Sequence, residues 1–212
     1  MLINDLKVLE KKLQNISDLR ICQRPFTENR LKLLEELCLE LKLLKKNFEA
    51  RSLVLYIRSI LKINFFEKYP SNAFGLGIVV HYGPGNLPIN CIYSWITGFI
   101  CGNINVVRSS TKTTNQQLEI IKIVSNLCWK NSFSDIFIVS KDPEKFANLT
   151  SKYCQARIIW GSDFIVSMIR KLNCSAKCRD IIFGDRKSAA IFNFDLIEKY
   201  SENRKNFFSA AL

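Results

Sequence analysis

The chain has 212 residues, of which 48% are hydrophobic, a length and composition that allow a buried core and exclude a disordered chain. Its 31 lysines and arginines against 19 aspartates and glutamates give a net charge of +12 at pH 7, which favours polyanionic or phosphorylated partners. The longest apolar run, 91–101, is too short to span a bilayer, and the N-terminus is unlike a signal peptide, so we expect a cytoplasmic protein without a membrane span.

The N-terminal third has a helical pattern. Residues 2–16, 28–48 and 51–63 have the periodicity of amphipathic helices, and Thr27 can cap the second of them. Because no strand pattern precedes residue 70, we predict a helical section over 1–70, either a separate subdomain or a layer on the next domain. The leucine stripe of the second helix is more typical of a core contact than of a partner-binding face.

Beyond a hinge at 65–73, marked by proline and Ser-Asn, strand and helix patterns alternate. The predicted strands are 76–82, 105–108, 135–140, 156–160 and 188–193. The predicted helices are 89–101, 115–130, 143–152, 163–172 and 195–208. This alternation predicts an α/β Rossmann-like domain over 71–212, a parallel sheet with helices on both faces.

The eight cysteines lack the spacing of a metal site. Four of them lie in apolar periodic segments, namely Cys38, Cys91, Cys101 and Cys128. Cys174 and Cys178 are the only close pair, and the only histidine, His81, is distant in sequence. Since a zinc site needs about four ligands, we predict free thiols in a reducing compartment rather than a metal centre or a disulfide framework.

Asn86 lies in the turn after the first predicted strand of the sheet, in the sequence PGNLP. Ligands of open α/β sheets bind at the carboxyl ends of the strands. A side-chain amide beside the free N–H groups of a helix start could stabilise an oxyanion. Alternatively, Asn86 caps the helix or shapes the turn.

Two later strand ends carry groups suited to phosphate. The first is the run Arg108, Ser109, Ser110, Thr111 and Lys112, with two cations and three hydroxyls. The second is Gly161-Ser162, where glycine permits close approach and the serine can cap a helix whose N-terminus attracts phosphate. The first run could equally be a solvated loop, and Asp163 would repel phosphate unless it faces the helix backbone.

Several separated motifs, in this order, resemble those of the LuxC family. The motifs are PGNLP, GNINVVRSS, CQARIIWGSD and FGDRKSA. This family comprises the fatty-acyl-CoA reductases of bacterial bioluminescence, which are distant members of the aldehyde dehydrogenase superfamily. The resemblance extends from residue 74 to the C-terminus and is weaker in the helical N-terminal part.

The resemblance implies residue roles. Asn86 matches the asparagine that holds the substrate carbonyl oxygen, and Arg108 matches a lysine that faces the cofactor ribose. Thr111 stands where NAD-preferring relatives often carry a glutamate, so a 2′-phosphate is not repelled and NADPH is the expected cofactor. Gly161-Ser162 matches the pair that contacts the pyrophosphate. The implied cofactor site therefore comprises Arg108, Ser109, Ser110, Thr111, Gly161 and Ser162.

The chain departs from the family pattern at two points. Phe183 occupies the position of the general-base glutamate, and its presence suits an enzyme that exchanges a thioester with CoA without activating water. None of the eight cysteines has the context of the family's nucleophile, which is expected beyond residue 212. The resemblance thus implies the cofactor-binding portion of an NADPH-dependent acyl-CoA reductase, which makes fatty aldehyde through an acyl-enzyme thioester and is inactive alone.

The chain would then be a truncated piece, part of a split gene or a degenerate product. Its expected partners are an acyl-CoA or acyl-carrier substrate bound with the catalytic domain, and an acyltransferase or synthetase subunit or the other half of a split enzyme. One alternative is a non-catalytic interaction or scaffold subunit that completes such an enzyme. Another is a basic nucleic-acid-binding protein, for which oligonucleotide binding should weaken steeply with salt.

Overall fold

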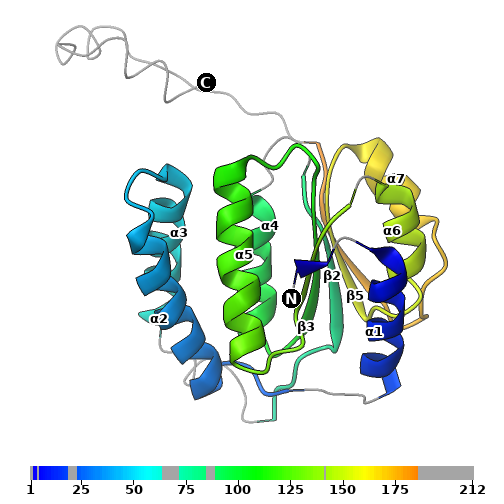
Figure 1. Cartoon of the computed structure of the whole chain (residues 1–212). Coiled ribbons are helices and arrows are strands. Elements are labelled where there is room, and N and C mark those ends of the chain that lie inside the picture. The colour runs from blue at the N-terminus through cyan, green and yellow to red at the C-terminus, as the bar shows by residue number, and fades with distance from the viewer. Residues whose placement is uncertain are drawn as a thin grey trace, which may run out of the picture.

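A six-stranded, fully parallel sheet forms the centre of the computed structural model (Figure 1). The structure describes residues 2–3, 5–18, 23–63, 72–84, 89–140 and 142–185. The strands are β1 (Leu2–Ile3), β2 (Ile78–Tyr82), β3 (Ile104–Ser109), β4 (Ile136–Val139), β5 (Ala156–Trp160) and β6 (Arg179–Phe183), in the order β1-β4-β3-β2-β5-β6. The predicted α/β Rossmann-like fold is confirmed, whereas the predicted strand 188–193 and helix 195–208 lie outside the described residues.

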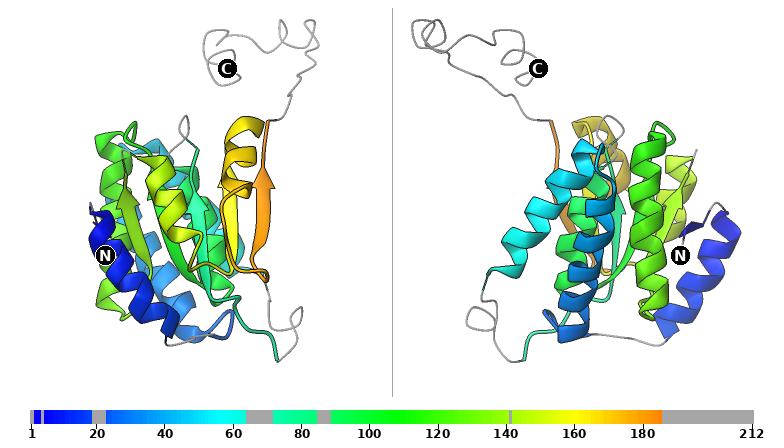
Figure 2. Two further views of the ribbon diagram at one scale, coloured as in Figure 1. Left: turned by 90° about the vertical axis from the view of Figure 1, so that its right-hand side faces the viewer. Right: turned by 60° about the vertical axis from the view of Figure 1, so that its left-hand side comes forward.

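Helices cover both faces of the sheet, and an additional pair lies outside one face (Figures 1 and 2). One face carries α4 (Asn90–Ile100) and α5 (Asn115–Lys130); the other carries α1 (Leu6–Asp18), α6 (Pro143–Thr150) and α7 (Asp163–Arg170); the outer pair is α2 (Glu28–Leu43) and α3 (Phe48–Leu61). Right-handed crossovers put the helices on opposite faces once the chain changes direction across the sheet. No helix of the described ranges is long and apolar enough to cross a membrane.

The outer pair shares one core with α4 and α5. Leu34, Leu37 and Leu41 of the predicted leucine stripe are buried in that core, which confirms the stripe as a core contact. Arg30 is also buried, and its guanidinium lies 4.6 Å from the ring centroid of Phe99. It also donates a hydrogen bond to the Phe99 carbonyl at the end of α4. A cation–π contact and a hydrogen bond thus join the outer helix pair to α4.

Two predictions about the N-terminal section are wrong. The section contains a strand, because Leu2–Ile3 pairs in parallel with β4 at the sheet edge; two residues are too few to produce a readable strand pattern. The expected helices 28–48 and 51–63 are both present, but with other bounds, because the first ends at Leu43 and the second begins at Phe48. Asn47 causes this restart, since its side chain accepts a hydrogen bond of 3.0 Å from the Ala50 N–H.

Besides β1, the described part of the sheet contains a second strand that the sequence pattern did not indicate. Arg179–Phe183 forms β6, which pairs with β5 alone among the described strands. It begins with Arg179 and Asp180 and is largely exposed, so it lacks the continuous apolar run of a strand covered on both faces. By contrast, all five residues of β2 are buried.

His81 of β2 belongs to a buried polar network beneath α4. The Asn105 amide nitrogen donates to the Asp135 carboxylate at 2.6 Å, which leaves the amide oxygen 2.9 Å from His81 Nε2. His81 must therefore donate through Nε2, and Nδ1 accepts from the Ser94 hydroxyl at 2.8 Å. Burial lowers the pKa of His81 to about 4, so the folded protein keeps this imidazole neutral.

This network predicts a loss of stability in acid. Because the folded-state pKa of His81 lies below the unfolded value, the unfolded chain binds a proton first, and stability falls as the pH drops from about 6.5 to 4. We expect the His81 contribution to reach about 3 kcal/mol. Urea unfolding of the native chain and of a His81→Gln variant at several pH values measures the difference in slope. Equal slopes for the two chains would contradict the prediction.

Candidate functional site

The carboxyl ends of β2 and β5 mark the point where the chain changes direction across the sheet. From β2 the chain moves outward through β3 and β4 and then returns to the other side of β2 as β5 and β6. The loops that leave β2 and β5 therefore run to opposite faces, which opens a crevice between them.

A cleft of about 600 Å³ lies at this crevice. Its walls include Gly83, Pro84, Arg108, Ser110, Trp160, Gly161, Ser162, Phe183, Gly184 and Asp185. An apolar slot of about 210 Å³ adjoins it between α6 and α7, lined in part by Pro143, Ala147, Ile165, Met168 and Ile169. Arg108, Gly83 and Trp160 line both spaces, so the cleft and the slot form one continuous candidate site.

The sequence-predicted residues divide into three groups. Arg108, Ser110, Gly161 and Ser162 line the cleft together. Ser109 and Thr111 do not: Ser109 is buried with its hydroxyl 2.6 Å from that of Thr113, and Thr111 is exposed outside the cleft. Asn86 lies outside the described residues, so its role as an oxyanion donor stays a prediction.

Arg108 brings a half-buried positive charge to the cleft. Its Nη2 donates to the Ser140 carbonyl oxygen at 3.2 Å, and its Nε has no partner among the described residues. Burial lowers the pKa of Arg108, and the Asp142 carboxylate partly offsets this effect. A guanidinium with a spare N–H group in a cleft can bind an anionic oxygen.

Ser162 caps α7, because its hydroxyl oxygen accepts a hydrogen bond of 3.4 Å from the Ile165 N–H. The two acidic residues nearby bind each other's backbone. The Asp163 carboxylate accepts from the Asp185 N–H, and the Asp185 carboxylate accepts from the Asp163 N–H, both at 3.2 Å. The Asp163 carboxylate thus turns toward the loop after β6, while Asp185 leaves a negative charge at the rim of the cleft.

Trp160 and Phe183 form the aromatic wall of the cleft. They are directly paired across β5 and β6, and their rings stack with centroids 3.9 Å apart and an interplanar angle of 8°. The indole Nε1 of Trp160 has no partner in the described part of the chain. Phe183 therefore fills, with an apolar ring, the position that the resemblance assigns to a general base.

No cysteine of the described ranges lines the cleft. Cys91 lies behind Gly83 but is fully buried, and burial raises the pKa of its thiol to about 12. It is protonated at neutral pH and is a poor nucleophile. Within the same ranges, no group of three or more histidine, cysteine, aspartate or glutamate side chains is arranged to hold a metal ion.

Sequence reasoning missed the apolar slot between α6 and α7. The sequence signal was the three-residue spacing of Ile165 and Met168, which puts both on one face of α7. In the structure these two side chains are exposed at 40% and 38%. Pro143 at the start of α6 was a second signal, because it closes the slot from the opposite helix. The distance between α6 and α7 depends on the order of the strands that they follow. The sequence of either helix by itself does not indicate it.

Several solved structures share the fold. Glyceraldehyde-3-phosphate dehydrogenase of Methanocaldococcus jannaschii, complexed with NADP, aligns with a TM-score of 0.60 and 16% identity over 82% of this chain and 44% of that one. The NADP-dependent glyceraldehyde-3-phosphate dehydrogenase of Bacillus halodurans, complexed with NADP, aligns with a TM-score of 0.59 and 14% identity over 82% of this chain and 44% of that one. Proline utilization A of Corynebacterium freiburgense aligns with a TM-score of 0.59 and 14% identity over 82% of this chain and 20% of that one.

At these identities the likeness shows the fold alone, and the chain spans less than half the length of each of the three structures. No curated protein sequence gives a significant match. The family model described as acyl-CoA reductase (LuxC) matches residues 10–205, which is most of the chain. This protein therefore belongs to the LuxC acyl-CoA reductase family.

Proposed function

We propose that the cleft binds NADPH and that the chain is the cofactor-binding portion of an acyl-CoA reductase. The observation that carries the proposal is the cleft at the switch point, which Arg108 and Gly161-Ser162 share. Membership of the LuxC family supports the reductase class. Two similar structures are dehydrogenases complexed with NADP, which supports a nicotinamide cofactor.

The residues present fit such a cofactor. Arg108 Nε and Trp160 Nε1 are buried without partners among the described residues, and both side chains line the cleft; buried N–H groups normally have an acceptor. The apolar slot between α6 and α7 would hold the adenine ring. The Gly161-Ser162 turn at the start of α7 would hold the pyrophosphate. Arg108 would bind the 2′-phosphate that distinguishes NADPH from NADH.

When bound, NADPH supplies the hydride that reduces an acyl group to an aldehyde. The chain's own residues bind and orient the cofactor, and the Trp160–Phe183 stack excludes water from one wall of the cleft. Because Phe183 carries no proton acceptor, this wall does not activate water against a thioester. Asn86 is proposed as the donor that stabilises the carbonyl oxygen of the acyl substrate.

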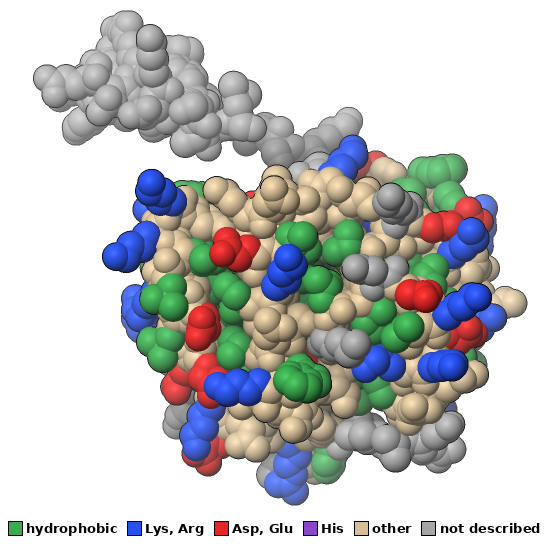
Figure 3. Space-filling model, viewed as in Figure 1, with side chains coloured by type: hydrophobic (Ala, Val, Ile, Leu, Met, Phe, Trp, Pro, Cys, Tyr) green, Lys and Arg blue, Asp and Glu red, His purple; other side chains and the backbone are tan. Residues whose placement is uncertain are grey.

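The nucleophilic thiol is proposed to come from a catalytic domain, in the same polypeptide or in a second one. This proposal rests on the cysteines of the described ranges, none of which lines the cleft. An acyltransferase or synthetase subunit would then deliver the acyl group. Nucleic acid is a less suitable partner, because on the face drawn in Figure 3 Lys and Arg are interspersed with Asp and Glu and form no continuous basic stripe.

We expect Arg108→Gln to weaken NADPH binding about tenfold and NADH binding much less, because only NADPH carries the 2′-phosphate. Lys112→Gln is the matched control, since it removes the same charge from the turn directly after β3 but lies outside the cleft. Calorimetric titration of the three chains with each nucleotide measures the effect. An equal loss for both nucleotides, or an equal loss in the lysine variant, would argue against Arg108 as the phosphate ligand.

Asp185→Asn should strengthen NADPH binding by roughly twofold to fivefold. The asparagine oxygen can still accept from the Asp163 N–H, while the negative charge at the rim of the cleft disappears. The gain should shrink as salt is added, because an exposed charge is screened. Glu40→Gln on α2 serves as the control. An unchanged affinity at low salt would show that phosphate does not bind near this rim.

The 212-residue chain should bind NADPH without reducing acyl-CoA. The reason is that the cleft has no thiol in the described ranges to form an acyl-enzyme. Incubation with acyl-CoA and NADPH, followed by assays for aldehyde and for free CoA, tests this expectation. Sustained aldehyde production by this chain alone would refute the proposed division of labour.

A further inference from the structure

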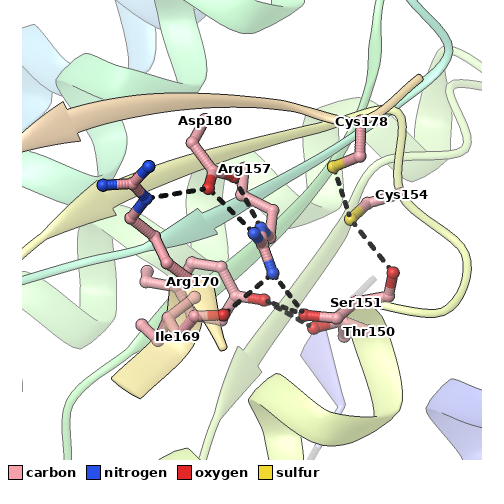
Figure 4. A network of polar contacts seen from close by, with 9 residues as sticks. Thr150, Ser151, Cys154, Arg157, Ile169, Arg170, Cys178 and Asp180 are labelled. Atoms are coloured by element: carbon pink, nitrogen blue, oxygen red, sulfur yellow. Dashed lines mark hydrogen bonds and ion pairs between the residues drawn. The ribbon is translucent and has the colours of Figure 1, made fainter. Parts of the chain in front are cut away.

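Two thiols lie in contact at the end of the sheet opposite the cleft. The sulfur atoms of Cys154 and Cys178 are 3.6 Å apart (Figure 4). Cys154 lies two residues before β5 and is fully buried, whereas Cys178 directly precedes β6 and is only partly buried. Cys178 is therefore the more accessible residue of the pair.

Paired strands hold the two thiols in place. The Arg179 N–H donates to the Gln155 carbonyl at 3.1 Å, and these two residues follow Cys178 and Cys154 directly. Cys154 is further fixed by α6, since its sulfur lies 3.6 Å from the Ser151 carbonyl oxygen. The start of β6 therefore lies beside the start of β5, and this pairing brings the two segments that carry the thiols together.

An ion pair beside the thiols fixes the same register. Arg157 of β5 is buried and binds the Asp180 carboxylate of β6 through two hydrogen bonds of 2.7 and 2.8 Å. Its remaining amino group donates to the Ile169 carbonyl at 2.9 Å and to the Ser151 hydroxyl at 3.3 Å. Figure 4 shows this network and the thiol pair side by side, so β5, β6, α6 and α7 meet at one rigid junction.

We propose that Cys154 and Cys178 form a site of reversible oxidation, at which hydrogen peroxide converts the two thiols to a disulfide. The Cys178 sulfur takes one peroxide oxygen to give a sulfenic acid, and one water leaves. The Cys154 sulfur then attacks the Cys178 sulfur, the S–S bond forms, and the second water leaves with the Cys154 proton. Two thiols and one peroxide thus give one disulfide and two waters, and a dithiol reductant reverses the reaction.

The geometry requires only a small movement. A disulfide joins sulfurs about 2.05 Å apart, so the pair must close by about 1.5 Å, which side-chain rotation can supply. Burial raises the pKa of both thiols, so the first step is slow compared with that of a specialised peroxide-reactive cysteine. The site therefore suits prolonged oxidant exposure rather than rapid signalling.

The disulfide would close the loop from Cys154 to Cys178, which contains β5 and α7. β6 has β5 as its only partner among the described strands, and its Ile181 and Ile182 are exposed at 45% and 37%. An edge strand of this kind opens more easily than a central one. Oxidation would therefore tie β6 to the sheet while leaving the cleft at the other end of the strands unaltered.

Cys174 provides the competing outcome. It is exposed, lies four residues before Cys178 and interacts with the Cys178 thiol, so both accessibility and proximity favour a linkage through it. The proposal commits to Cys154 because its sulfur already lies 3.6 Å from that of Cys178. Peptide mapping distinguishes the two linkages directly.

The test exposes the reduced 212-residue chain to hydrogen peroxide, blocks the remaining thiols with N-ethylmaleimide and maps peptides without reductant. We expect a Cys154–Cys178 linkage, the loss of two hydrogen masses, and a melting temperature raised by roughly 5 °C. Dithiothreitol should reverse all three changes. Cys174→Ser should retain them, and Cys178→Ser, which alters only a partly buried side chain, should abolish them.

A linkage through Cys174, or higher oxidation of Cys178 with Cys154 still free, would overturn the proposal. So would a linkage that forms only after the chain is unfolded in urea. NADPH titration of the oxidised and reduced chains provides an independent readout, in which the affinity should change less than twofold. A failure of NADPH binding in both forms would count against the proposed function and leave the thiol result unaffected.

Discussion

The parallel pairing of β2 with β3 on one side and β5 on the other is the constraint on which the rest of the structure depends. The chain leaves β2 toward β3 and β4 and later returns to the other side of β2 as β5, which creates the switch point and hence the cleft. It also buries all five residues of β2 under helices on both faces. A single arrangement of strands thus determines both the core and the position of the candidate site.

Burial of β2 and β3 requires that their polar side chains satisfy one another. His81, Asn105 and Asp135 form a chain of hydrogen bonds that ends on Ser94 and Trp95 of α4. Each donor in this chain has an acceptor, which removes most of the cost of burying the groups. The network fixes the position of α4 against the sheet, and α4 in turn supports the outer helices through the core that they share.

The opposite ends of β5 and β6 carry different chemistry. At the carboxyl ends, the stacked rings of Trp160 and Phe183 face a cleft that contains a half-buried arginine. At the amino ends, an arginine–aspartate pair and two thiols lie in a rigid junction. Because parallel strands align all their carboxyl ends at one edge, ligand-binding groups gather there, and the other edge is free to carry a separate site.

The sequence by itself determined the alternation of strands and helices, the apolar core and the family, because local periodicity or short motifs indicate each of these. It also indicated Arg108, Ser110, Gly161 and Ser162, since each follows a readable strand. Only the tertiary structure decided which strand ends adjoin, that Ser109 turns into the core, and that β1 and β6 complete the sheet edges. These features depend on strand order and register, which join residues far apart in the chain and leave no local pattern.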